Sequence, residues 1–313
     1  MARSSLAPTA GLAPRRPWWR VSAWKRGEYL AAAVFIAPGL IWFLGFMLYP
    51  LVYSFWMSLH DWKIRGPSEF VGLANYVRVF GDSVNLIALR NTVVYGVLSV
   101  PTQMFLGLMI ALGLERLSRG KVLLRLIYYL PVISSWVVVS LMFMFLFNSE
   151  GLFNHVFGDV LGLVDPNTAW LNRASTAIPV IALLGVWKGL GWSMLIYLAA
   201  LQGIPAELTE AARVDGANRA QVTRYVTVPL LKPTTLFIAV MLTIGAFQSF
   251  IQFYIITGGG PVHQTEVFLS YMYDQAFNFL DFGYASAIAW LLAALILAIS
   301  LVQFRLIKST YEY

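Results

Sequence analysis

Six apolar stretches, separated by shorter polar segments, run along the chain. They cover residues 29–55, 92–114, 122–147, 176–200, 234–256 and 282–304. A helix rises about 1.5 Å per residue, so each stretch is long enough to cross a hydrocarbon core of about 30 Å. The alternation of apolar and polar residues that is typical of a membrane barrel is absent from these stretches. The pattern therefore predicts an all-α fold, a polytopic membrane bundle of six transmembrane helices.

Most of these stretches carry proline, at Pro38, Pro50, Pro101, Pro131 and Pro179. In water such prolines would argue against helices, because each removes a backbone hydrogen bond. In a membrane bundle, neighbouring helices satisfy the carbonyl groups that proline frees. We therefore expect kinked spans.

The composition supports a lipid-embedded chain. Of the 313 residues, 59% are hydrophobic and 12% are charged, whereas an ordinary soluble domain carries about 25% charged residues. A chain with so few charges has too little polar surface to cover itself in water. Lipid is the natural solvent for that surface.

No residue pattern indicates catalysis, metal binding or a bound cofactor. The chain has no cysteine, which excludes disulfides, thiolate metal sites and thiol nucleophiles. Its three histidines, His60, His155 and His263, are isolated and lack metal-ligand spacing. The segment 113–121 differs from a phosphate loop in its glycine spacing, and Val122 stands where Ser or Thr would bind magnesium. The sequence therefore predicts a protein that is not an enzyme and that hydrolyses no ATP by itself.

The positions of the basic residues predict an orientation in the membrane. With the N-terminus inside, sixteen of the 22 Lys and Arg residues fall in cytoplasmic segments and five in outer loops, while Lys188 lies within a span. Cytoplasmic loops carry such an excess of Lys and Arg. We expect a multi-pass protein of a bacterial or archaeal inner membrane with both termini cytoplasmic. The formal net charge of +7 is then a topology signal and not a nucleic-acid-binding patch.

The chain divides by composition into a tail and a membrane domain. Residues 1–28 are polar and basic, and we interpret them as a cytoplasmic N-terminal tail with an interfacial stretch around Trp18, Trp19 and Trp24. Residues 29–313 form the predicted six-span domain. Within it, residues 201–233 form a cytoplasmic loop between the fourth and fifth spans.

This loop carries the most informative local pattern. Residues 206–214 favour a helix, Gly216 can adopt the left-handed dihedrals that end one, and residues 218–226 fit a second short helix. Two short helices joined by a glycine corner would make a rigid knob, and a rigid knob can transmit force to a partner. From these residues alone, an ordinary amphipathic interfacial loop is an equally good interpretation.

The motif in this loop resembles a known one. The loop contains Glu210-Ala211-Ala212, then Asp215-Gly216-Ala217, and then Pro229. This order resembles the EAA loop of the permease subunits of binding-protein-dependent ABC importers. It is similar above all to the carbohydrate-uptake family, which includes the maltose and glycerol-3-phosphate permeases. Residues 71–76, 90–92, 258–261 and 282–285 resemble further segments of that family, so the resemblance covers nearly the whole chain. One departure is Thr223, where the family usually has an aromatic residue; Tyr225 follows two positions later.

The resemblance implies a fold, partners and a mechanism. It implies the type I ABC importer permease fold, a second permease subunit that completes a heterodimer, two copies of a cytoplasmic ATPase subunit and an extracytoplasmic solute-binding protein. In that family the loop inserts into a cleft on the ATPase, so the implied coupling residues are Glu210, Ala211, Ala212, Asp215, Gly216 and Pro229. Glu210 would make a charge-assisted contact with the ATPase, Gly216 would set the corner, and Asp215 would cap or pair locally.

Polar residues within two spans indicate where a solute would bind. Lys188 is the only Lys or Arg near the centre of a span, and charged groups at that depth are costly and usually functional. Sugars have flat apolar faces that aromatic rings cover, and hydroxyls that amide and ammonium groups can bind. The predicted substrate-binding set comprises Trp187, Lys188, Trp192, Gln248, Ser249 and Gln252. The alternative is that these residues only pack or hydrogen-bond between helices, or that the partner permease holds the solute.

The sequence thus predicts the transmembrane subunit of an ATP-driven importer for a mono- or oligosaccharide. An importer of the same type for glycerol-3-phosphate or a glycerophosphodiester remains an alternative. A secondary transporter is a lesser one, because no internal repeat or coupling-ion site is visible.

Overall fold

The computed structural model describes residues 23–62 and 66–307, so most of the predicted N-terminal tail lies outside the described residues. The chain divides into two units, residues 1–53 and 54–313. The first unit contains helix α1 (Ala23–Trp42), the π-helical turn η1 (Phe43–Leu48) and the start of α2 (Tyr49–Ser58), which ends in the second unit. Nearly all of its large apolar side chains are exposed, as expected for a helix that faces lipid.

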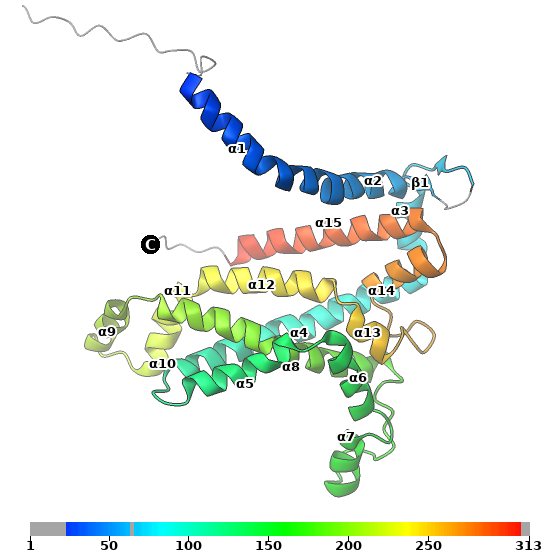
Figure 1. The fold of residues 1–313 in the computed structure, drawn as a ribbon. Coiled ribbons are helices and arrows are strands. Elements are labelled where there is room, and N and C mark those ends of the chain that lie inside the picture. Colours follow the sequence, from blue (N-terminus) through cyan, green and yellow to red (C-terminus); the bar gives the residue numbers. More distant parts are fainter. Residues whose placement is uncertain (1–22, 63–65, 308–313) are drawn as a thin grey trace, which may run out of the picture. The chain divides into compact units, whose positions relative to one another are not determined.

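The second unit holds the remaining spans (Figure 1). Its four longest helices are α4 (Ser83–Glu115), α8 (Ala174–Gln202), α12 (Lys232–Phe247) and α15 (Phe282–Leu306). Together with the first unit's helix, five described segments are long and apolar enough to cross a membrane, and a bent helix pair is a sixth if its two helices form one span. The predicted helical membrane bundle is confirmed.

The third predicted span is broken in two. It consists of α5 (Lys121–Ile133) and α6 (Trp136–Leu146), which meet at an angle of 92°. Pro131 lies in the last turn of α5, and Ser134 and Ser135 between the helices have extended backbone dihedrals. The sequence predicted kinked spans, and this bend is the largest of them.

Short elements connect the long helices. Strands β1 (His60–Asp61) and β2 (Glu69–Phe70) pair in antiparallel fashion, with His60 opposite Phe70 and Asp61 opposite Glu69. The other connecting helices and π-helical turns are α3 (Ala74–Gly81), α7 (Leu152–Asn154), η2 (His155–Val160), α9 (Ala206–Val214), α10 (Arg219–Val222), η3 (Thr223–Thr227), α11 (Val228–Leu230), α13 (Ile251–Ile256), α14 (Phe268–Tyr273) and η4 (Asp274–Asn278).

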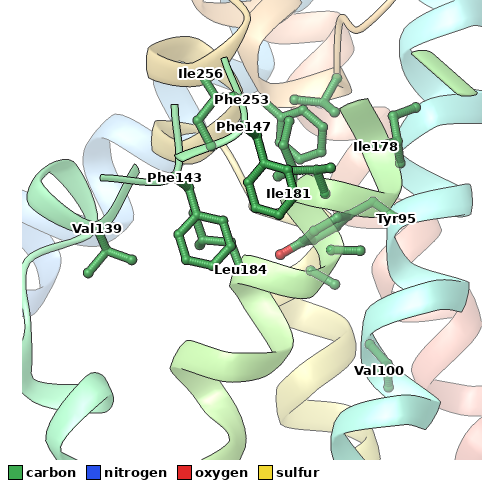
Figure 2. Close-up of a cluster of buried hydrophobic side chains, with 14 residues drawn as sticks. Tyr95, Val100, Val139, Phe143, Phe147, Ile178, Ile181, Leu184, Phe253 and Ile256 are labelled. Carbon is green, nitrogen blue, oxygen red and sulfur yellow. The ribbon is translucent and has the colours of Figure 1, made fainter. Parts of the chain in front are cut away.

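The core sits where α4 packs along α8. A buried apolar cluster joins these two helices to α6 and α13, and Figure 2 shows its side chains pointing toward one another. The ring of Tyr95 on α4 meets the ring of Phe253 on α13 edge to face, with centroids 5.1 Å apart. Aromatic pairs favour this arrangement, so the cluster both buries area and fixes the order of the helices.

A polar network ties the helix ends together where α4 and α15 begin. Asp82 caps α4 by accepting hydrogen bonds from two backbone N–H groups, and it also accepts from the hydroxyls of Tyr271 (2.5 Å) and Tyr284 (2.8 Å). Burial by itself would raise the pKa of Asp82, but these four donors favour the carboxylate and lower its pKa below the ordinary value. Arg78 pairs with Asp281 at 2.7 Å beside this network.

Candidate functional site

The loop between α8 and α12 folds as the predicted knob. Helix α9 covers Ala206–Val214, as expected, and the second helix begins at Arg219 and continues through the π-helical turn η3. Asn218 and Gln221 form a reciprocal capping box at the start of α10, with hydrogen bonds of 2.7 and 3.0 Å. The second helix of the knob therefore begins at a specific pair of hydrogen bonds.

Gly216 makes the corner. Its φ is +87°, a value that a residue with a Cβ adopts only with strain. The N–H groups of Gly216 and Ala217 donate to the carbonyl oxygens of Arg213 and Ala212, each at 3.0 Å, and these bonds close the end of α9. This is the left-handed helix ending that glycine favours.

The outer face of α9 is apolar and exposed. Leu208, Ala211 and Val214 follow one another at a spacing of three residues and therefore share a face. The exposed fractions are 41% for Leu208 and 88% for Val214, and Ala211 is also exposed. Sequence reasoning selected Ala211 but missed Leu208 and Val214, which their helical spacing could have revealed.

The other predicted coupling residues surround this face. Glu210 and Asp215 are exposed, Ala212 and Pro229 are half-buried, and Tyr225 beyond the corner is 68% exposed. The knob thus presents apolar, acidic and basic side chains outward, the basic ones including Arg213 and Arg224. Leu201 at the end of α8, Val222 on α10 and Leu231 just before α12 are buried.

A cavity of about 310 Å³ lies between α4, α6, α8 and α12. Its wall combines aromatic rings with amide and hydroxyl groups and contains no Lys, Arg, His, Asp or Glu. The lining residues are Tyr95, Ser99, Val100, Gln103, Trp136, Gly185, Gly189, Trp192, Met241, Leu242, Gly245, Ala246 and Ser249. We call this the central cavity.

Close helix approach shapes this cavity. Gly189 on α8 lies so near the Gln103 amide of α4 that a Cβ there would collide with it. Small residues at helix contacts are the usual means by which membrane helices approach closely. The side chain of Gln103 therefore packs against α8 at Gly189.

Two of the six predicted solute-binding residues line the central cavity, namely Trp192 and Ser249. Gln252 is buried and donates a hydrogen bond of 3.3 Å to the Tyr95 hydroxyl, which Figure 2 shows among the buried rings. Gln248 is exposed at the end of α12, and Trp187 is 40% exposed. Neither is part of the cavity wall.

Lys188 is buried, and its ammonium group binds backbone rather than open space. It donates to the carbonyl oxygens of Pro131 (3.2 Å), Val132 (3.1 Å) and Ser134 (2.9 Å), at the break between α5 and α6. The ammonium also lies 4.7 Å from the ring centroid of Trp136. An ammonium has three N–H donors, and all three are used here.

Among the cavity residues missed at the level of sequence, four have polar or aromatic side chains, namely Tyr95, Ser99, Gln103 and Trp136. The first three recur every four residues in the second apolar stretch, so they share one helix face. This polar stripe can be recognised in the sequence and could have predicted these three residues. Trp136 carries no such signal, because only the bend after α5 brings it to the cavity.

Comparison with known proteins agrees with this arrangement. Residues 103–309 match the family described as "Binding-protein-dependent transport system inner membrane component". The chain is 39% identical over 284 residues to the probable ABC transporter permease protein YurN of Bacillus subtilis, covering 89% of this chain and 96% of that protein. It is 33% identical over 288 residues to the lactose transport system permease protein LacF of Rhizobium radiobacter, covering 90% and 96%.

A solved structure has the same fold. It is a bacterial ABC transporter involved in the import of the acidic polysaccharide alginate, and one of its chains matches with a TM-score of 0.78 and 25% sequence identity. The match covers 92% of this chain and 99% of that chain. The chain has helical spans and the knob between α8 and α12, and these relatives match it over nearly their whole length. It therefore belongs to the family of inner-membrane permease components of binding-protein-dependent ABC importers.

Proposed function

We propose that this permease carries a neutral saccharide through its central cavity in an ATP-driven importer. The observation that supports this most is the cavity wall, which combines three aromatic rings with amide and hydroxyl groups and contains no charged side chain. Such a wall suits a solute with apolar ring faces and many hydroxyls. A phosphate group would lack a cationic partner there, because all three N–H donors of Lys188 are used by carbonyl oxygens.

The names of the relatives support the same class of solute. LacF is named for lactose, and the SmoG permease of Agrobacterium fabrum, which is 32% identical, for sulfoquinovosyl glycerol. The UgpA permease of the same organism is named for sn-glycerol-3-phosphate at 31% identity. Glycerol-3-phosphate is therefore the second candidate, and it is the one that the neutral wall disfavours.

The knob is the proposed contact with an ATPase subunit. In this proposal it lies in the cytoplasm, both termini lie on the same side, and ATP is hydrolysed by the separate subunit. Leu208, Ala211 and Val214 would fill an apolar cleft, while Glu210 would bind a basic side chain at its edge. Exposed apolar faces of this kind mark interaction surfaces. A second permease and an extracytoplasmic solute-binding protein complete the assembly.

The test uses the reconstituted assembly of this permease with its partner permease, ATPase subunits and solute-binding protein. ATP hydrolysis is measured with lactose, maltose, trehalose and raffinose, and separately with sn-glycerol-3-phosphate. The proposal predicts that at least one neutral saccharide stimulates hydrolysis and is taken up, and that glycerol-3-phosphate is not.

A pair of variants assigns the transport to the central cavity. Gln103→Leu removes an amide from the cavity wall and should lower uptake about fivefold or more, the equivalent of one lost hydrogen bond of about 1 kcal/mol. Gln202→Leu makes the same change at the exposed end of α8 and should leave uptake unchanged. Stimulation by glycerol-3-phosphate alone would refute the neutral-saccharide assignment.

A further inference from the structure

A second cavity lies at the opposite end of α8 from the knob. Its volume is about 530 Å³. Helix α8 has 29 residues and is therefore about 42 Å long, so this outer cavity and the knob are separated by the thickness of a membrane. The outer cavity is lined by Met144, Phe145, Phe147, Asn148, Ser149, Ala169, Trp170, Leu171, Asn172, Ile256, Thr257, Gly260 and Pro261.

The wall of the outer cavity has the same chemistry as that of the central cavity. It presents aromatic rings, side-chain amides and hydroxyls, and none of its thirteen lining residues is charged. The side-chain amide of Asn172 and the Nδ2 of Asn148 make no hydrogen bond within the described residues, whereas Asn148 Oδ1 accepts from Ser149. Amide groups are thus free to bind hydroxyls of a ligand. A neutral, hydroxylated ligand fits this wall.

The aromatic part of the wall is held in place before any ligand arrives. The indole N–H of Trp170 donates to Asn154 Oδ1 at 2.6 Å. Asn154 is buried, and its Nδ2 donates to the carbonyl oxygens of Ser149 (2.9 Å) and Thr168 (2.8 Å). Trp170 also meets Phe153 edge to face at 5.3 Å. A binding surface that is already ordered loses little entropy when a ligand binds.

Both cavities border the buried cluster whose side chains Figure 2 draws. Phe147 and Ile256 belong both to this cluster and to the outer cavity. Tyr95 and Val100 belong both to the cluster and to the central cavity. The cluster is therefore an apolar barrier bordered by two chemically similar cavities.

We infer that the outer cavity is a second saccharide site, which binds a neutral sugar unit before the apolar barrier opens toward the central cavity. This inference rests on the proposed function, because it assumes that a saccharide is the transported solute. Trp170 would cover an apolar ring face of the sugar, and Asn148 and Asn172 would bind its hydroxyls. The barrier keeps the two sites from forming one open channel.

The experiment fills the outer cavity without removing any existing hydrogen bond. Ala169 lines it and is exposed, so Ala169→Phe adds a ring to the cavity. Asn167→Phe is the matched control, because Asn167 lies on the same loop, is exposed and is not part of the lining. The probe is whichever of lactose, maltose, trehalose and raffinose stimulates ATP hydrolysis most in the reconstituted assembly. Asn172→Ala removes one proposed contact.

The readouts are the half-saturating concentration of sugar-loaded binding protein, the maximal uptake rate and the affinity of the assembly for sugar-free binding protein. Ala169→Phe should raise the half-saturating concentration about fivefold or more, which corresponds to a loss of about 1 kcal/mol or more of sugar binding. Asn172→Ala should raise it about threefold, which corresponds to about 0.6 kcal/mol. The maximal rate, the affinity for sugar-free protein and the control should not change.

Three outcomes would overturn the inference. An unchanged half-saturating concentration in Ala169→Phe would mean that no sugar binds there, and the proposed function would still stand on the central-cavity variants. An equal loss of affinity for sugar-free binding protein would make the cavity a protein-docking surface instead. If no neutral saccharide stimulates hydrolysis in the wild type, the proposed function fails and this inference fails with it.

Discussion

Replacing Lys188 by methionine tests the role that the structure gives this residue. Methionine keeps an unbranched stem of similar length and removes the ammonium group. The change deletes three hydrogen bonds, of 2.9 to 3.2 Å, to carbonyl oxygens at the break between α5 and α6. Pro131 O also accepts from the N–H and the hydroxyl of Ser134, whereas the carbonyl oxygens of Val132 and Ser134 have no other donor among the described residues.

The expected cost follows from two opposing effects. Hydrogen bonds to a charged donor contribute about 1.5 kcal/mol each at the low end, so three of them contribute about 4.5 kcal/mol. Removing a charge from the middle of a membrane helix recovers about 2.5–3.5 kcal/mol. The free energy of the lost hydrogen bonds exceeds the free energy gained by removing the charge, so the variant is less stable by about 1–2 kcal/mol. Such a loss lowers a thermal midpoint by about 3–6 °C.

The assay compares the thermal midpoint and the uptake rate of the purified assembly carrying Lys188→Met. We expect a lower midpoint together with reduced uptake of every transported solute, because Trp136 begins α6 directly after the bend and lines the central cavity. Lys121→Met is the control. It makes the same chemical change at the opposite end of α5 and should alter neither quantity.

Two results would refute this reasoning. A wild-type midpoint in Lys188→Met would mean that the three hydrogen bonds do not hold the bend. A changed half-saturating solute concentration at an unchanged midpoint would show instead that Lys188 contacts the solute, as the sequence by itself suggested.

Three further predictions concern the knob, the outer helix ends and the topology. Glu210→Lys and Gly216→Val should abolish uptake while the permease still reaches the membrane. The first change reverses a charge at the proposed ATPase contact, and the second strains a residue with a φ of +87° by about 1–3 kcal/mol. Normal uptake with a co-purifying ATPase would rule out the knob as the coupling element. The pKa of Asp82 is below its ordinary value of 3.8, so the stability that its carboxylate contributes is complete above about pH 4 and is lost as the pH falls through the lowered value. Asp82→Asn should therefore lower the thermal midpoint at pH 7 and make the midpoint fall less steeply in acid. Superimposable curves of midpoint against pH for the two proteins would contradict this. A reporter that is active only outside the cytoplasm should be inactive when fused after Tyr313, and strong activity there would reverse the proposed orientation.

The positions of the helices were readable from sequence because they depend on local properties. A span must be apolar over about 20 residues wherever it lies in the fold, so hydrophobicity marks it without knowledge of its neighbours. The same holds for the knob. Gly216 ends α9 through its own backbone freedom, and Asn218 and Gln221 cap α10 through bonds only three residues apart.

The site was only partly readable because it depends on partners far apart in the chain. A lysine within a span signals a function, but the sequence does not say which group the ammonium meets. The three carbonyl oxygens that bind Lys188 lie 54 to 57 residues before it. They are within reach only because the chain bends by 92° between α5 and α6. The same bend brings Trp136 to the central cavity.

The sequence by itself therefore determined the membrane class, the apolar spans and the two short helices with their glycine corner, because hydrophobic length and backbone dihedrals act over a few residues. Only the tertiary structure decided which polar groups meet. It placed Tyr95, Gln103 and Trp136 around one neutral cavity and directed the ammonium of Lys188 to backbone carbonyl oxygens. The physical reason is that a buried polar group must find a partner in space, and packing between distant helices decides which partner is within reach.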